Sequence, residues 1–236
     1  MRKGSGKLKR IKRKLSGIVR SVAPLPVWNA YLRARGLGQL HPWRTFGYMA
    51  SRADPRPLFE GRFADLYAKY CSLDPTADPE RARYVHYCNC FFAFLCRYVP
   101  GDFVCAGVSY GVGAKMVFEF TDFPSLGKTL HLIDPFEGIS PGGIAENYNR
   151  DPEYVRRQYP ADAPIVMHRA RIPLRLPGKL AFVVATTGVP AAEEASIPIF
   201  YEALSPGGIM ISDRYLELPS VTPLWMPSAL AVYFKQ

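Results

Sequence analysis

The sequence lacks any apolar run of about 18 residues, although 48% of its 236 residues are apolar and 13% are aromatic. A bilayer-spanning helix needs about 20 consecutive apolar residues, so we expect a protein that is not membrane-spanning. Cysteine is scarce: the chain has five, an odd number without regular spacing. This excludes a disulfide framework and favours reduced thiols in a cytoplasmic compartment. Cys88 and Cys90 would point to different faces of a helix, which argues against zinc.

Acidic residues are absent from the first twenty positions, which hold nine of the chain's 30 Lys and Arg residues. The rest of the chain is therefore nearly neutral, despite the formal net charge of +10. Within this segment apolar residues recur at three- and four-residue intervals, so they would share one side of a helix. Such a helix suits an anionic lipid surface, and we expect residues 1–22 to bind one, with the protein cytoplasmic or peripheral at the inner membrane face.

Three other interpretations of this tail stay open. Basic clusters also bind nucleic acid, but the tail has no aromatic residue for base stacking, which makes nucleic acid the weaker partner. An Arg-rich segment without acids also fits a mitochondrial presequence. The tail could also be a disordered, solubilising extension.

The most informative stretch runs from Pro100 to Gly138. It predicts a strand at 103–106, a glycine-containing loop at 107–113 and a helix that opens near Ala114, followed by a buried strand at 129–133. Asp134 ends this second strand, where a carboxylate could accept hydrogen bonds from ribose hydroxyls. A glycine loop followed one strand later by an acid predicts a nucleoside-cofactor site. Glycines there would let backbone N–H groups approach the ligand.

The glycine spacing helps to choose the cofactor. A dinucleotide fingerprint requires G-x-G-x-x-G, but Met116 stands where the third glycine belongs. The spacing is instead G-x-x-x-G-x-G, from Gly107 through Gly111 to Gly113, which is similar to motif I of the class I S-adenosylmethionine-dependent methyltransferases.

Four segments together resemble the macrocin O-methyltransferase family of sugar methylases over about 79–215: P-G-D-F-V-C-A-G-V-S-Y-G-V-G-A at 100–114, D-P-F-E-G-I at 134–139, R-I-P-L-R-L-P at 171–177 and L-S-P-G-G-I-M-I-S-D-R-Y at 204–215. The resemblance implies S-adenosylmethionine as cofactor and a small-molecule or glycolipid acceptor. His168 and Arg169 end a third strand, where class I enzymes place residues near the adenine. The cofactor-binding candidates are therefore Gly107, Val108, Ser109, Tyr110, Gly111, Gly113, Asp134, Phe136, Glu137 and Arg169.

The family's acidic metal site is mostly missing. In the resembled family an L-D-x-D run on the fourth strand and a D-D pair after the fifth supply metal ligands and the base. Here the matching residues are Ala185-Thr186-Thr187-Gly188 and Asp213-Arg214. We therefore expect no metal, and we expect Asp213 either to act as the base or to pair with Arg214. His168 is a second candidate base, and Glu193 with Glu194 fit helix N-terminal charges.

Strands and helices alternate along the chain, which predicts an α/β fold: a Rossmann-like class I methyltransferase with a mostly parallel sheet flanked by helices. Few residues follow Tyr215, so we expect a trimmed C-terminal end. The expected organisation is a basic tail at 1–23, a lid or acceptor-side segment at 24–78 and the Rossmann-like domain at 79–236. Trp28, Trp43, Phe46 and Tyr48 of the middle segment could stack on a sugar or simply pack on the core.

Three functions fit these observations. The first is O-methyl transfer to a sugar or glycoconjugate hydroxyl, and the second is a degenerate relative that binds cofactor or a partner without turnover. The third, a nucleic-acid methylase, is disfavoured because the chain has T-T-G-V-P where amino-methylating enzymes need a D-P-P-Y-like turn.

Overall fold

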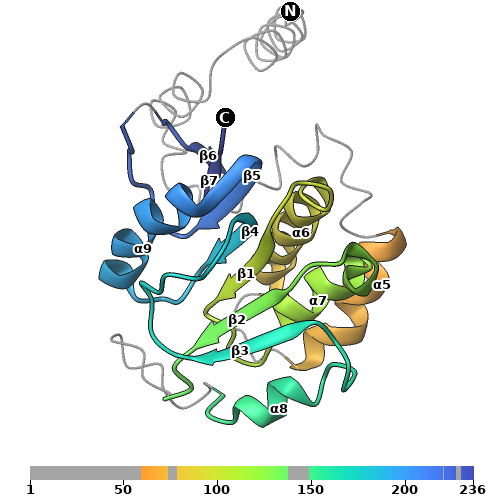
Figure 1. Ribbon diagram of the computed structural model, residues 1–236. Coiled ribbons are helices and arrows are strands. Elements are labelled where there is room, and N and C mark those ends of the chain that lie inside the picture. Colours follow the sequence, from red (N-terminus) through yellow and green to blue (C-terminus); the bar gives the residue numbers. More distant parts are fainter. Residues whose placement is uncertain (1–59, 74–78, 138–148, 220, 227–229) are drawn as a thin grey trace, which may run out of the picture. The chain divides into compact units, whose positions relative to one another are not determined.

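The computed structural model describes residues 60–73, 79–137, 149–219, 221–226 and 230–236 (Figure 1). The chain divides into two compact units, Met1–Thr45 and Phe46–Gln236, and every described residue belongs to the second. Within this described part, no helix has both the length and the hydropathy needed to cross a bilayer. The expectations for the basic tail and for the aromatic residues at 28, 43, 46 and 48 lie outside the described residues.

In the described part of the chain, seven strands form one sheet in the order β3-β2-β1-β4-β5-β7-β6 (Figure 1). The first five strands in this order are parallel to one another, and β7 is antiparallel to both β5 and β6. Their bounds are β1 Asp102–Ala106, β2 Leu130–Asp134, β3 Ile165–Arg169, β4 Leu180–Ala185, β5 Leu204–Ser212, β6 Leu224–Met226 and β7 Leu230–Phe234. The mostly parallel, helix-flanked Rossmann-like sheet predicted from the alternation is confirmed.

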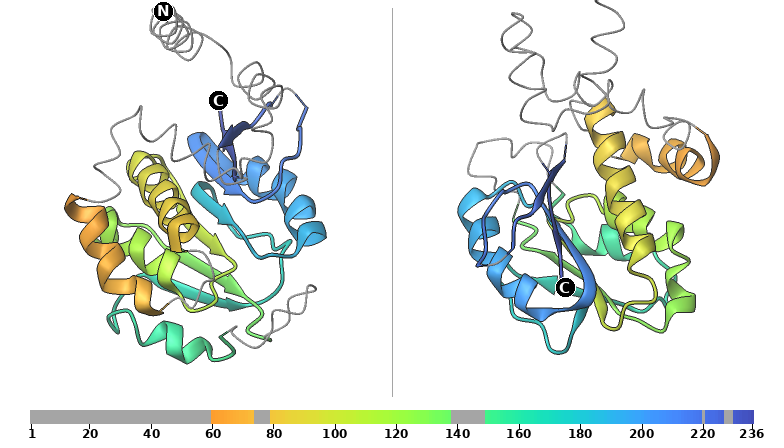
Figure 2. Two further views of the ribbon diagram at one scale, coloured as in Figure 1. Left: turned by 180° about the vertical axis from the view of Figure 1, so that it is seen from behind. Right: turned by 90° about the horizontal axis from the view of Figure 1, so that it is seen from above.

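Helices cover both faces of the sheet (Figure 2). One face carries α6 (Pro79–Leu95), α7 (Val112–Phe120) and α5 (Gly61–Tyr70), and α9 (Pro190–Ala203) lies on the other. The short α8 (Pro152–Arg156) precedes β3, and 3-10 turns occupy Cys71–Leu73 and Phe123–Leu126. α5 comes from the segment predicted as a lid, but it packs beside α7 and α6 as part of this helical layer.

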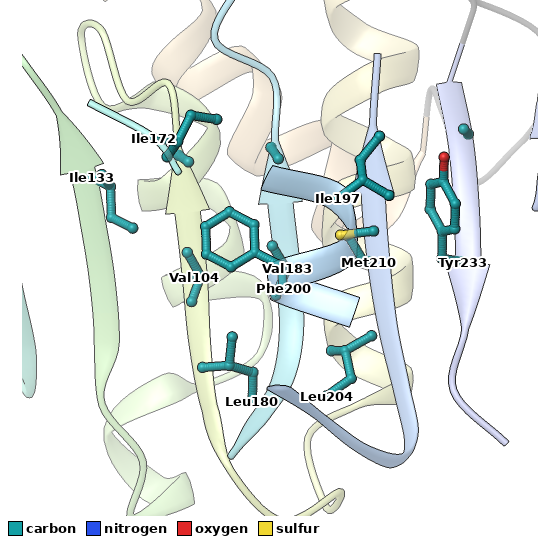
Figure 3. Close-up of a cluster of buried hydrophobic side chains, with 13 residues drawn as sticks. Val104, Ile133, Ile172, Leu180, Val183, Ile197, Phe200, Leu204, Met210 and Tyr233 are labelled. Atoms are coloured by element: carbon teal, nitrogen blue, oxygen red, sulfur yellow. The ribbon is translucent and has the colours of Figure 1, made fainter. Parts of the chain in front are cut away.

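The core on the α9 face explains why the central strands are apolar throughout (Figure 3). All six residues of β4 are buried, because helices cover both of its faces. Phe200 and Ile197 of α9 lie against Val183, Val104 and Met210 of the strands. Fully burying one such side chain contributes about 1.5–3 kcal/mol, so this layer fixes the strand ends where the site lies.

Two elements differ from the sequence-based expectations. The sequence pattern over 147–158 predicts a helix, but α8 begins only at Pro152, because Asp151 caps it by accepting from Glu153 N and the fixed φ of proline suits the first helical position. The C-terminal end, which was expected to be trimmed apart from a strand at 230–235, carries the reversed strand pair β6 and β7. Among the residues described between β5 and β7 there is no helix.

Candidate functional site

The loop from Gly107 to Gly113 joins β1 to α7, as predicted, and it turns through positive φ at Gly107 (87°), Ser109 (49°) and Gly111 (83°). Packing against other parts of the chain requires these glycines. A Cβ on Gly107 would lie 2.2 Å from the Thr186 carbonyl oxygen, and one on Gly111 would lie 3.0 Å from the Val155 side chain. The sequence predicted that these glycines let a ligand approach the backbone. At Gly107 the space beside Cα is instead filled by the backbone of Thr186, so this glycine is needed for packing within the chain.

Asp134 ends β2 beside this loop, and its carboxylate is fully buried. Its Oδ2 accepts from Ser109 N at 3.0 Å, and its Oδ1 accepts from Phe136 N at 2.8 Å. Phe136 is itself buried and has φ of 51°, a left-handed conformation that is costly for a bulky residue. Asp134 therefore holds the glycine loop against β2 in this conformation, and contact with a ribose would require that loop to shift.

Two polar residues that the sequence analysis did not single out support the loop from the α8 side. Asn149 Nδ2 donates to Ser109 O at 3.1 Å, and Gln158 Nε2 donates to Tyr110 O at 2.7 Å. Polar residues within a segment predicted as a helix give no sequence signal for such contacts. The contacts depend on residues 149–158 packing against the loop.

Of the remaining cofactor candidates, Val108 is buried in the loop, and the Tyr110 ring meets Tyr154 edge-on at 6.2 Å. Glu137 is exposed and forms an ion pair with Arg171. Arg169 ends β3 and is in register with Asp134 on β2, so these two candidates are neighbours across the strands. The candidate set thus lies around the carboxyl ends of β1, β2 and β3.

A cavity of about 130 Å³ lies on the other side of the glycine loop, where α6 meets the ends of β1 and β4. The His86 ring packs against Gly113, where an added Cβ would lie 3.2 Å away. Asn89 is 5% exposed, and its carboxamide oxygen has no hydrogen-bond partner among the described residues. Asn89 was not predicted as part of the cofactor site. For His86 the sequence left a place facing the pocket open but favoured a surface or packing role. The cavity's lining is Val85, His86, Asn89, Cys105, Ala106, Gly107, Val108, Ser109, Tyr110, Val112, Gly113, Ala114, Val117, Val184 and Thr186.

The acceptor-side candidate Asp213 follows β5, next to a buried carboxylate from α9. Burial first, and then the charge of Glu193, raise the pKa of Asp213 to about 6, and Arg81 and Arg214 oppose this rise. Arg214 forms its ion pair with Glu193, at 3.4 Å from Nε to Oε2. Two roles were expected for Asp213, as the base or as the partner of Arg214. Glu193 bears on both, because it forms an ion pair with Arg214 and its charge raises the pKa of Asp213.

Glu193 lies in the first turn of α9, as the sequence predicts, and its side chain is also completely buried. Its Oε1 accepts from Thr187 N at 2.5 Å, from Gly188 N at 2.7 Å and from the Thr187 hydroxyl at 3.0 Å. The neighbouring Glu194 is exposed. Glu193 therefore ties the loop after β4 to Arg214 after β5, at the two places where the resembled family carries acids.

The second base candidate, His168, does not join Asp213. His168 lies on β3 and Asp213 follows β5, four strand positions away and thus roughly 19 Å at about 4.8 Å per strand. The His168 ring instead contacts His131, at 3.0 Å from Nε2 to Nδ1. Burial and His131 lower the pKa of His168. The two catalytic candidates cannot act on one acceptor oxygen, and the geometry favours Asp213.

Among the described residues, no three His, Cys, Asp or Glu side chains gather as a metal-binding group. The prediction that the protein uses no metal stays a prediction.

No protein-family model matches this sequence, and no curated protein does either. Solved structures resemble its fold. The O-methyltransferase NovP superposes with a TM-score of 0.52 at 16% identity, covering 64% of this chain and 79% of NovP. The Podospora anserina methyltransferase PaMTH1, solved with S-adenosylhomocysteine bound, gives a TM-score of 0.49 at 13% identity, over 80% of this chain and 96% of its own. The likeness to NovP supports the Rossmann-like fold described above.

Proposed function

We propose that this protein is an S-adenosylmethionine-dependent methyltransferase that acts on a sugar or glycoconjugate hydroxyl without a metal. The observation that carries the proposal is the strained glycine loop, held by Asp134 beside a partly open cavity at the carboxyl ends of β1 and β4. In open α/β sheets ligands bind at this edge, where the strand order reverses. The fold shared with the O-methyltransferase NovP supports the reaction class.

The residues on both sides of the Gly107–Gly113 loop could hold S-adenosylmethionine. The loop after β1 and Asp134, which would contact a ribose once that loop shifts, form the adenosine side. The cavity beyond them offers room and the Asn89 carboxamide oxygen, which has no partner among the described residues. When bound, the cofactor would supply an electrophilic methyl group on a sulfonium. The protein's part is then to align the acceptor hydroxyl and to take its proton.

We assign to Asp213 the role of the base that takes the proton of the acceptor hydroxyl. A carboxyl group with a pKa of about 6 is deprotonated near pH 7 yet more basic than an ordinary aspartate, which suits a general base. Glu193 and Arg214 hold the loops on either side of it. Arg214 brings a guanidinium to the position that matches a metal-ligand acid of the resembled family, so a divalent ion there would be repelled.

Calorimetry tests the proposal, with S-adenosylmethionine and S-adenosylhomocysteine as ligands and NAD as the control. We expect both adenosyl ligands to bind and NAD not to bind. Methyl transfer to sugar acceptors should survive EDTA. The proposal fails if neither adenosyl ligand binds, and its metal-independent part fails if chelation abolishes activity and Mg²⁺ restores it.

A second candidate is a protein of this fold that binds the cofactor without turnover. The absent family acids and the closed arrangement of Asp134 favour it. Tight binding of S-adenosylhomocysteine together with no transfer to any acceptor in a broad sugar and glycolipid screen would select this candidate.

A further inference from the structure

The carboxyl-terminal half of α6 presents a second apolar face to solvent. Phe91, Phe94 and Leu95 of this helix and Tyr98 in the turn after it are spaced by three and four residues, so they share one side. Their exposed fractions are 41%, 37%, 49% and 79%, and they are four of the eight large apolar residues exposed in the described part of the chain. We call these four side chains the α6 ridge. Apolar side chains that are exposed together mark an interaction surface.

The core of the domain uses the opposite side of the same helix. Cys88, Phe92, Ala93 and Cys96 are buried there, where α6 packs against α7, α5 and the strands β4 and β5. A surface helix of this kind is normally polar on its outer side, and a helix that is apolar all round is normally buried all round. The α6 ridge is therefore a face that lacks a covering layer.

The charged groups that contact the ridge are cations. The Arg97 guanidinium carbon lies 3.8 Å from the centre of the Phe94 ring and 4.4 Å from that of Tyr98. Arg62 of α5 lies 5.7 Å over the Phe120 ring, which meets Phe94 edge-on at 6.0 Å. An apolar surface edged by guanidinium groups favours an anionic partner.

A second copy of this chain fits the ridge poorly. At about 150–250 Å² for each whole aromatic side chain, its three aromatic residues leave roughly 300 Å² open to solvent. Even with Leu95 added, this is well below the area of about 800 Å² that each partner buries in a stable interface. A two-fold contact would also bring equal charges together, because residues 81–101 include three Arg and no Asp or Glu.

The surface of an anionic bilayer requires neither a large area nor a complementary shape. Phenylalanine and leucine insert at the boundary between headgroups and acyl chains, and tyrosine lies at the headgroup level. Arginine keeps its guanidinium at the lipid phosphates while its stem lies along apolar groups. The ridge and Arg97 present these residue types together along one side of α6.

The position of the ridge leaves the candidate cofactor site open. The carboxyl-terminal end of α6 leads to the amino end of β1 at Asp102, whereas the glycine loop follows the carboxyl end of β1 at Ala106. A surface that contacts the ridge therefore meets the domain at the edge of the sheet away from that loop.

We propose that the α6 ridge docks this protein on an anionic lipid surface, with its four side chains inserted at the headgroup level and Arg97 at the lipid phosphates. This contact belongs to the folded domain and is separate from the one expected of residues 1–22. It does not rest on the proposed function.

The test is co-sedimentation of the full-length protein with vesicles of equimolar phosphatidylserine and phosphatidylcholine. It is done at low salt and at about 1 M salt, where the screening length is about 3 Å and charge attraction to the basic tail is suppressed. We expect wild type to keep binding at high salt, and Leu95→Ser/Tyr98→Ser to bind about 10- to 30-fold more weakly. Leu95→Trp should bind more tightly than wild type, because tryptophan favours the bilayer interface.

Tyr215→Ser/Leu224→Ser is the matched control, because it removes the same two residue types from exposed positions outside the ridge. Its affinity for the vesicles should stay within about twofold of wild type. The melting temperature of Leu95→Ser/Tyr98→Ser should stay close to that of wild type, since both replaced side chains are exposed.

Three results overturn the inference. The ridge variant and the control variant bind the vesicles equally well, or wild type loses all vesicle binding at high salt, which would assign binding to the basic tail alone. The third is a wild-type dimer in analytical ultracentrifugation that Leu95→Ser/Tyr98→Ser dissociates, which would assign the ridge to a second copy of the chain.

Discussion

Glu193→Ala provides a strong test of the site geometry. The substitution removes the acceptor for two backbone N–H groups, of Thr187 and Gly188, and for the Thr187 hydroxyl. The hydroxyl can rotate toward another acceptor, but the two amides cannot. At about 1–3 kcal/mol for each stranded donor, and with some water entry to this partly buried loop, we expect a loss of about 3 kcal/mol in the free energy of unfolding.

For a domain of this size, each kcal/mol shifts the melting temperature by about 2–4 °C, so Glu193→Ala should melt roughly 6–12 °C below wild type. Thermal and urea unfolding measure both quantities. Glu194→Ala is the matched control, because the adjacent glutamate is exposed and should change stability by no more than about 0.5 kcal/mol. Glu193→Gln should fall between the two, since it keeps an acceptor oxygen but loses the charge that faces Arg214.

The refuting result is equal behaviour of Glu193→Ala and Glu194→Ala. It would mean that both side chains are ordinary charges at the start of α9, and that Glu193 does not join the loops after β4 and β5.

Three further predictions concern the titration of Asp213, the role of Asp134 and the basic tail. The folded pKa of Asp213, about 6, lies above its ordinary value of 3.8, so wild type should lose stability as the pH rises from about 4 through 6. Asp213→Asn lacks this loss, and its stability advantage in unfolding should be larger at pH 7.5 than at pH 4; a constant difference would contradict the raised pKa. Asp134→Ala should lower S-adenosylhomocysteine affinity by about 1.5–3 kcal/mol in calorimetry, through loss of charge-assisted hydrogen bonds, and unchanged affinity would count against the site. Residues 1–22 should bind anionic vesicles in co-sedimentation at low salt, with about 1 kcal/mol from each cation near the surface, and their deletion should leave cofactor affinity unchanged; a preference for RNA over vesicles would refute this.

The sequence determined the architecture of the described domain because its signals are local. Apolar runs such as Leu180–Ala185 identify strands buried on both faces, and glycine and proline mark the turns between them. The Gly107–Gly113 loop and Asp134 were predicted in the correct places for the same reason, since each follows directly from the end of a strand. The later start of α8, at Pro152, was missed because the Asp151 cap and Pro152 override a weak helical pattern.

Tertiary structure decided which side chains meet. Glu193 and Glu194 are neighbours with the same chemistry, and only the packing of α9 on the sheet buries one and exposes the other. His168 and Asp213 both lie near strand ends, but the strand order separates them, and no local pattern encodes that order. Asn89 looks like an ordinary residue in a helix until the ends of β1 and β4 close a cavity around it. Contacts between segments far apart in the chain depend on the whole fold, and therefore they have no signature in one stretch of sequence.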